Sequence, residues 1–225
     1  YLEGGYYPKG GPSVIAKSII KRINKYYGMV LVGEKVRNIL IQNGVVKGVL
    51  MNNGDIIPAK NVVSATGIRT TFETLVNKCQ VPTIYKNIIE NIPPSSQHFY
   101  LFVNLDGTPE NLNLPSNNFW IYPENRETGE SDYTELINGM LTDPLDSKSK
   151  VPAFLGFSCR KDTSWNERFP NRSNCVIITQ VDYEYFKQWD NGRDIDYRRI
   201  KEEISLKILD TILYIFPQNI KILMF

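Results

Sequence analysis

The sequence predicts two regions of different architecture: an α/β region with a β-hairpin meander, followed by an α+β region in which helices accompany an antiparallel sheet. Two Asn-Gly pairs, Asn43-Gly44 and Asn53-Gly54, each lie between β-rich runs, which is the strongest short-range signal for a hairpin. After about residue 94 the pattern changes to alternating apolar and polar residues, rich in aromatics and separated by long polar loops with prolines.

The first region begins with a helix at about residues 12–26, because apolar residues recur there at helical spacing and Lys and Arg occupy the opposite face. The following β-rich runs are short and bounded by turns. We expect strands near 29–32, 35–42, 45–51, 55–59 and 61–65, and helices at 69–78 and 82–91.

The second region contains runs with a period of two and aromatic residues on both faces, which is typical of antiparallel strands. The change of pattern near residue 94 gives two domains, 1–94 and 95–225. We expect strands at 97–105, 118–123, 152–159 and 174–182, and helices near 131–141, 183–189 and 196–216.

Composition excludes several kinds of function. The 225 residues are 42% hydrophobic, which is sufficient for a sizeable core, and 26 basic and 24 acidic residues give a net charge of +2. This balance does not favour nucleic-acid binding. One histidine, His98, and three cysteines without metal-ligand spacing argue against a metal site and a Ser-His-Asp or Cys-His nucleophile. Cys159 and Cys175 fall on predicted strands and are best explained as small buried thiols.

The glycine-rich stretch GGYYPKGG, residues 4–11, precedes a predicted helix, where phosphates often bind. It does not match a P-loop, because Gly11-Pro12 stands where that motif has Lys followed by Ser or Thr. It also lacks the glycine spacing and the preceding strand of a dinucleotide fingerprint. Its residues alone predict a turn and a helix start, with Pro12 at the first helical position.

The two ends suggest an interior piece of a longer protein. Tyr1 is not an initiator, and the chain stops in the apolar run NIKILMF. No run reaches the roughly 18 apolar residues that a membrane-spanning helix requires.

Two stretches resemble a family of flavoproteins. The GG-Y-P-x-GG turn, helix and hairpin, followed by VVSATG at residues 62–67, are similar to the second FAD-contacting segment of the amine-oxidase/phytoene-desaturase superfamily. The region 162–189, with its DTSWNERFPNRS run and its tyrosine- and tryptophan-bearing helix, resembles the retinol saturase branch, which is akin to the carotenoid isomerases. The resemblance covers essentially the whole chain. It implies that residues 1–94 are part of a glutathione-reductase-like FAD-binding domain, and that 95–225 form a substrate domain returning toward it at the C-terminus.

The resemblance also implies a set of FAD contacts. Val36 matches a valine whose backbone N–H and C=O contact the adenine. The small-residue turn after the last strand matches the segment beside the pyrophosphate and ribityl chain, although many members have prolines where this chain has Thr66-Gly67. The glycine pair before the first helix would let the backbone approach the flavin ring. The cofactor-binding residues assigned in this way are Val36, Ala65, Thr66, Gly67, Gly10 and Gly11.

Aromatic residues are the candidates for lining a dry tunnel that holds a polyene. Tyr7 lies beside the glycine pair, and the others lie on predicted strands, where each of them could equally belong to the core. No residue is assigned as catalytic, because the proton donor is unknown and His98 fits a solvated strand end. The substrate-binding residues proposed are Tyr7, Phe102, Trp120 and Phe157, with Phe99, Phe119, Tyr122 and Phe154 as further lining residues.

The activity that the resemblance implies is that of an FAD-dependent oxidoreductase acting on CH–CH groups, incomplete in this chain. Reduced FAD would deliver a hydride to one carbon of retinol or a related polyene, with NAD or NADP as a candidate source of electrons. The implied partner is a retinoid or carotenoid-like polyene, and the implied location is the endoplasmic-reticulum membrane, with peripheral association. Gln180 departs from the small or apolar residue expected there and loosens the substrate assignment.

Two other functions remain open at this point. The same fold would also suit cis-trans isomerisation or desaturation of a carotenoid. A non-catalytic lipid-carrying or interaction module without flavin is the second alternative.

Overall fold

The computed structural model describes residues 5–92, 97–122, 138–141, 143–146, 151–189, 192–212 and 222–223. The chain divides into two units, one formed by residues 1–19 and 96–225 and the other by residues 20–95. Helix α1 (Ser13–Lys25) contains the junction between them. The first 19 residues therefore group with the later part of the chain, whereas the sequence groups them with the hairpin region.

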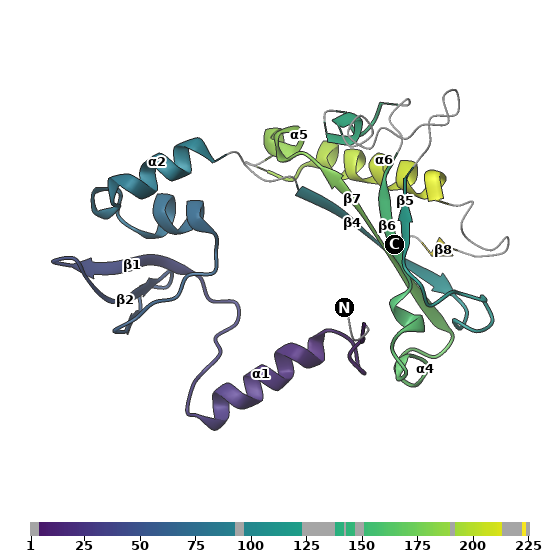
Figure 1. Ribbon diagram of the computed structural model, residues 1–225, viewed down its shortest axis with the longest axis horizontal. Helices are drawn as coiled ribbons and strands as arrows, with labels where there is room; N and C mark the ends of the chain where they lie inside the picture. Colours follow the sequence, from purple (N-terminus) through teal and green to yellow (C-terminus); the bar gives the residue numbers. More distant parts are fainter. Residues whose placement is uncertain are drawn as a thin grey trace. The chain divides into compact units, whose positions relative to one another are not determined.

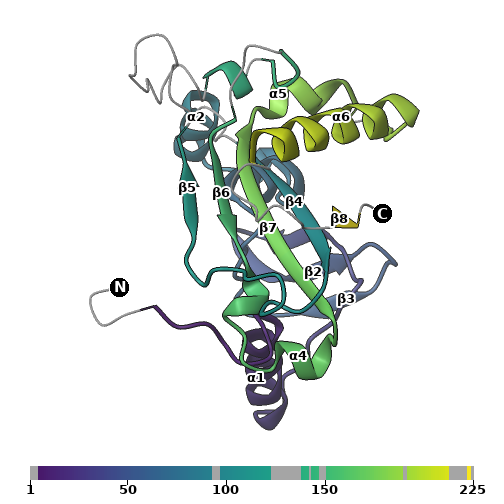
Figure 2. The ribbon, with the colours of Figure 1, turned by 90° about the vertical axis from the view of Figure 1, so that its right-hand side faces the viewer.

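The unit of residues 20–95 is built on an antiparallel sheet of β1 (Val36–Gln42), β2 (Val45–Met51) and β3 (Ile56–Pro58), in the order β1-β2-β3. Figure 1 labels β1 and β2, and Figure 2 labels β3. Asn43 and Gly44 join β1 to β2 with φ angles of 51° and 74°, as a two-residue hairpin turn requires. Gly48 of β2 has a φ of 146°, and a Cβ there would overlap the Ile57 carbonyl of β3. The predicted hairpin meander is confirmed.

Two helical segments follow this sheet: a π-helical turn (Thr70–Leu75) and α2 (Thr83–Asn91), with a 3-10 turn (Lys78–Gln80) between them. The rings of Phe72 and Tyr85 stack with centroids 4.7 Å apart. The Arg69 guanidinium donates hydrogen bonds to the carbonyl oxygens of Ile89 and Ile92, at 2.7 and 2.6 Å, and so satisfies the C-terminal end of α2.

Two expected strands are wrong. Residues 29–32 and 61–65 form no strand pairing in the described part of the chain. An apolar run becomes a strand only when a neighbouring strand supplies hydrogen bonds, and neither run has such a neighbour among the described residues. The Ser64 hydroxyl lies 2.7 Å from that of Thr71. The helix expected at 69–78 is shorter in the structure, where Thr70–Leu75 form a π-helical turn.

The other unit is built on a five-stranded antiparallel sheet in the order β5-β6-β7-β4-β8, as predicted for the second region (Figure 2). Its centre is the pair β4 and β7, which is matched over ten consecutive residues without a bulge. The strands are β4 (Gln97–Asp106), β5 (Phe119–Ile121), β6 (Ala153–Gly156), β7 (Arg172–Val181) and β8 (Ile222–Leu223).

Helix α6 (Ile195–Ile212) packs on one face of this sheet. Its Ile204 and Ile208 are fully buried in one cluster with Leu105 of β4 and Leu155 of β6. Residues 213–216 of the expected helix, and 131–137 of another, lie outside the described residues. The other helical segments of this unit among the described residues are residues 138–141, a 3-10 turn (Ser158–Arg160), α4 (Trp165–Arg168), α5 (Tyr183–Phe186) and a second 3-10 turn (Lys187–Trp189).

The buried cysteines behave as structural thiols. Cys159 and Cys175 are both free and buried, as the sequence indicates, although Cys159 lies in a 3-10 turn rather than a strand. Burial raises the pKa of Cys175 to about 12. Among the described residues there is no group of three or more potential metal ligands. None of the described helices combines the length and apolar character that a membrane span requires.

Asp162, the first residue of the 162–189 region, is bonded to the glycine-rich stretch that precedes α1. Its carboxylate accepts a hydrogen bond from the Gly10 N–H at 3.0 Å, although the two residues are 152 positions apart. It also accepts from the N–H and the hydroxyl of Ser164 and forms an ion pair with Arg168. The side chain is 1% exposed. A buried carboxylate surrounded by donors therefore holds the glycine turn against the segment before α4.

These contacts determine the charge of Asp162. Burial by itself would raise the pKa of the carboxyl group, but the Gly10 and Ser164 hydrogen bonds and the Arg168 charge outweigh it and lower the pKa to about 2. The folded protein therefore favours the ionised form more than the unfolded chain does. The resulting stabilisation is present above a pH of about 4 and is lost as the pH falls toward 2.

Asp162→Asn should loosen the glycine turn, because charge-assisted hydrogen bonds are roughly twice as strong as neutral ones. We expect amide exchange in the peptide covering residues 6–11 to become about tenfold faster at neutral pH, which corresponds to about 1.4 kcal/mol. Exchange in α6 should not change. The matched control is Asp106→Asn, which removes a half-exposed carboxylate that pairs with Arg172 at 3.6 Å. Equal exchange in both variants would contradict the anchoring role.

Candidate functional site

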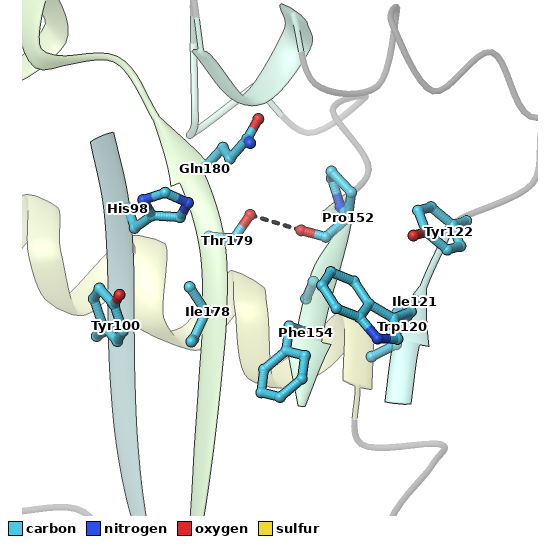
Figure 3. A pocket seen from close by; sticks show the side chains of 11 residues that line it. His98, Tyr100, Trp120, Ile121, Tyr122, Pro152, Phe154, Ile178, Thr179 and Gln180 are labelled. Carbon is cyan, nitrogen blue, oxygen red and sulfur yellow. Dashed lines mark hydrogen bonds between the residues drawn. The ribbon is translucent and has the colours of Figure 1, made fainter. Parts of the chain in front are cut away.

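The sheet of β5, β6, β7 and β4 has two faces of different chemistry. Side chains alternate along a strand, so residues two apart share a face. On β4, Phe99 and Val103 are buried on the side of α6, whereas Tyr100 and Phe102 point to the opposite side and are exposed. Figure 3 shows this second side, with α6 passing behind the strands.

We call this second surface the aromatic face. The register arranges its side chains in rows across the strands. Tyr100 pairs with Ile178, Ile178 with Phe154, and Phe154 with Trp120. The members of the face are His98, Tyr100 and Phe102 from β4, Val176, Ile178 and Gln180 from β7, Phe154 from β6, Trp120 from β5, and Tyr122 just after β5.

The aromatic face exposes far more ring surface than a sheet packed on both sides would. Phe102 is 72% exposed and Trp120 is 66% exposed. The rings of Trp120 and Phe154 meet edge to face with centroids 5.1 Å apart. Contiguous exposed apolar surface of this kind is typical of interaction and ligand-binding surfaces.

A hollow of about 310 Å³ lies on the aromatic face (Figure 3). Trp120, Phe154 and Ile178 form its apolar part, and His98 and Gln180 form its polar end. These two are paired directly across β4 and β7. The Thr179 hydroxyl, on the buried side, donates to the Pro152 carbonyl at 2.7 Å and so fixes the edge of β6. The arrangement suits an elongated apolar molecule with a polar group at one end.

The other end of the aromatic face carries a lysine. Lys161 follows the 3-10 turn after β6, and its ammonium donates to the side-chain oxygen of Asn118, just before β5. Burial lowers the pKa of Lys161, against the opposing effect of the nearby thiols of Cys159 and Cys175. This pair lies beside Gly156, two residues beyond Phe154 on β6.

The structure distributes the proposed substrate residues over three places. Phe102 and Trp120 lie on the aromatic face, as do the further lining residues Tyr122 and Phe154. Phe157 is 2% exposed and belongs to the core cluster, so its ring does not reach the aromatic face. Phe99 and Phe119 also face the core. Tyr7 is half-buried in the N-terminal segment.

Sequence reasoning missed several members of the face. Tyr100 could have been found, because it is two residues from Phe102 on one strand and therefore shares its face. His98 follows by the same argument. Asn118 falls within the expected strand 118–123, but Lys161 lies outside the strands, and the meeting of the two depends on how β5 and β6 pair.

Val36, the residue matched to an adenine contact, lies at an edge of its sheet. The Asn52 N–H donates to the Lys35 carbonyl at 2.8 Å, so Val36 and its partner Met51 form the non-hydrogen-bonded kind of antiparallel pair. In such a pair the N–H and C=O point away from the partner strand. Because β1 is the first strand in the order β1-β2-β3, these groups face the outer edge of the sheet.

The other residues matched to FAD contacts lie in turns. Ala65 to Gly67 are exposed, and Gly67 has a φ of 90° with no atom within 4 Å of the position that a Cβ would take. Gly10 and Gly11 have φ values of 93° and 83° and belong to the other unit, on the turn that Asp162 holds.

Comparison with known proteins gives a consistent result, although no protein-family model matches the chain. All-trans-retinol 13,14-reductase of Danio rerio is 32% identical over 230 residues, which cover 97% of this chain and 37% of that protein. A second Danio rerio protein, named inactive all-trans-retinol 13,14-reductase, is 31% identical over 227 residues. The match covers 96% of this chain and 37% of that protein. The chain thus spans little more than a third of the length of the curated relatives it matches.

Two further similarities have a narrower scope. The chloroplastic prolycopene isomerase of Daucus carota is 33% identical over 87 residues, which are 39% of this chain and 14% of that protein. The crystal structure of an oxidoreductase from Methanosarcina mazei superposes with a TM-score of 0.60 at 16% identity, covering 96% of this chain and 42% of that one, and it shows the shared fold.

The retinol reductase similarity extends over 97% of the chain. The chain is therefore a homologue of the all-trans-retinol 13,14-reductases over nearly its whole length, and a shorter part of it is similar to a carotenoid isomerase.

Proposed function

We propose that this chain supplies the substrate-binding sheet and part of the flavin site of an FAD-dependent oxidoreductase that saturates one double bond of retinol or a related polyene. The observation that carries this proposal is the aromatic face, where a row of rings and branched apolar side chains lies exposed across four strands. The reductase relatives support the class of reaction.

A conjugated chain is flat, rigid and apolar, and it packs well on aromatic rings. Trp120 and Phe154 meet edge to face, so that together they present two differently oriented ring surfaces. Binding there would remove water from the rings and from the polyene, which contributes about 25 cal/mol for each Å² of apolar surface buried. The role of these side chains is to hold one segment of the polyene in a fixed orientation and to exclude water.

The residues matched to FAD fit a cofactor held through the main chain. Val36 presents its N–H and C=O at the outer edge of β1, where an adenine ring can accept and donate hydrogen bonds. Gly67 has no side chain and open space beside it, which suits close approach of a phosphate or ribityl chain. When bound, reduced FAD would supply the hydride, and NAD or NADP is a candidate source of its electrons.

We include the endoplasmic-reticulum membrane and peripheral membrane association in the proposal, on the resemblance alone. Two alternatives have support of their own. The prolycopene isomerase similarity favours isomerisation of a polyene by the same face. The relative named as inactive favours a non-catalytic polyene-binding role.

The reaction can be identified from the absorbance of the substrate. We expect the full-length protein that contains this chain, incubated with all-trans-retinol under reducing conditions, to shift the absorbance maximum to shorter wavelength, because saturation shortens the conjugated system. An isomerase would leave the number of conjugated double bonds unchanged, which product mass measures directly. Unchanged mass with a changed retention time would favour isomerisation, and binding without any product would favour the non-catalytic alternative.

Trp120→Ala should impair the reaction without unfolding the protein, because the ring is 66% exposed and contributes little to the core. We expect kcat/KM to fall about tenfold, because an aromatic contact contributes about 0.5–1.5 kcal/mol beyond its buried area and a tenfold change corresponds to about 1.4 kcal/mol. The matched control is Tyr26→Ala, which removes an exposed ring from the end of α1. Similar losses in both variants, or none in Trp120→Ala, would contradict a substrate contact at Trp120.

Val36→Ala and Val36→Pro should differ in flavin content. Alanine keeps the main-chain groups, whereas proline deletes the N–H that faces the outer edge. Because this N–H does not bond to β2, proline should leave the hairpin paired. We expect near-normal flavin in Val36→Ala and a large loss in Val36→Pro, measured as flavin released per mole of protein. Circular dichroism checks the fold, and normal flavin in a folded Val36→Pro would contradict the assignment.

A further inference from the structure

Lys161 and Asn118 occupy the position on the aromatic face that a side chain at residue 156 would otherwise fill. Gly156 is two residues beyond Phe154 on β6, so a Cβ there would point to the same face. That Cβ would lie 2.9 Å from the Asn118 Oδ1, 3.3 Å from the Lys161 Nζ and 3.5 Å from the Phe154 ring. The ammonium and the amide therefore lie next to the aromatic row, in space that exists because residue 156 is glycine.

The Lys161 ammonium has hydrogen-bonding capacity to spare. It carries three donors, and among the described residues the Asn118 oxygen accepts one of them. The ion pairs of the described residues involve other basic side chains. Partial burial deprives the ammonium of water, as its lowered pKa reflects. A partly desolvated cation is stabilised when a ligand oxygen takes the place of the missing water.

The position also matches the shape of an elongated ligand. Residue 156 pairs with Val176 and Phe154 pairs with Ile178, so a molecule anchored at Lys161 and running along β7 passes over the aromatic row. Along β7, Gln180 lies four residues beyond Val176 and pairs with His98. At the rise of an extended strand, the distance between these two rows of residues is roughly 13 Å.

We propose that Lys161 and Asn118 form a subsite for the terminal oxygen of the polyene, so that this protein selects polyenes ending in a hydroxyl or carbonyl group over hydrocarbon polyenes. The inference rests on the proposed function, which it deepens by naming the class of substrate. Lys161 donates to the ligand oxygen, and Asn118 holds the ammonium in place.

Equilibrium binding tests the proposal without requiring turnover. The protein containing this chain is titrated with all-trans-retinol and with the hydrocarbon of the same carbon skeleton that lacks the hydroxyl, and quenching of tryptophan fluorescence reports binding. We expect the unaltered protein to bind retinol about tenfold more tightly than the hydrocarbon, because one additional hydrogen bond to a charged group typically strengthens binding by about this factor. Lys161→Met should abolish this preference by weakening retinol binding while leaving hydrocarbon binding unchanged.

Lys187→Met is the control. Lys187 is an exposed lysine in the 3-10 turn after α5, and it forms an ion pair with Glu184 on α5. Gly156→Ala is a second, milder variant. Its methyl group would push Lys161 and Asn118 from their positions and should also reduce the preference for retinol. Equal affinities in the unaltered protein, or an unchanged preference in folded Lys161→Met, would overturn the subsite. Retinol binding with the expected preference but without reduction would instead count against the proposed reaction alone.

Discussion

The uninterrupted antiparallel pairing of β4 with β7 is the constraint on which the rest of this unit depends. Ten consecutive residue pairs align without a bulge. Because side chains alternate, this register sends Val103, Leu105 and Ile177 to the α6 side and Tyr100, Phe102 and Ile178 to the other. A slip of one residue would exchange the two sets. The hydrophobic core therefore enforces the register, and the register in turn creates the aromatic face.

A second long-range contact connects the N-terminal segment to the same unit. Asp162 bonds to the Gly10 N–H and is itself kept ionised by Ser164 and Arg168. A buried carboxylate that lacked these donors would be costly, so the turn and its acceptor stabilise each other. In the proposed enzyme this contact would hold the glycine pair that the resemblance associates with the flavin. The binding surface and part of the cofactor site would then share one structural unit.

The aromatic face combines apolar rings in the middle with polar groups at both ends. His98 and Gln180 lie at one end, and Lys161 and Asn118 lie at the other. A purely hydrocarbon ligand would leave the partly buried Lys161 ammonium short of acceptors, whereas an oxygen-terminated polyene would supply one. The departure at Gln180, which loosens the substrate assignment at the level of sequence, becomes part of this pattern, because its side chain adds a polar group opposite His98.

The sequence by itself determined most of the local elements and the relatives that this protein resembles. Asn43-Gly44 is sufficient for a hairpin because its residues tolerate positive φ, and period-two alternation is sufficient for β4 and β7. It could not decide whether the 61–65 run pairs, because a strand needs a partner whose position local residues do not encode. Nor could the sequence distinguish Phe102 from Phe157, since both are aromatic residues near strand segments. Only the packing of the sheet against α6 makes Phe157 a core residue and leaves Phe102 on the surface. The meeting of Lys161 with Asn118, 43 residues apart, was likewise decided by tertiary structure, because it depends on β5 pairing with β6 and on the space left at Gly156.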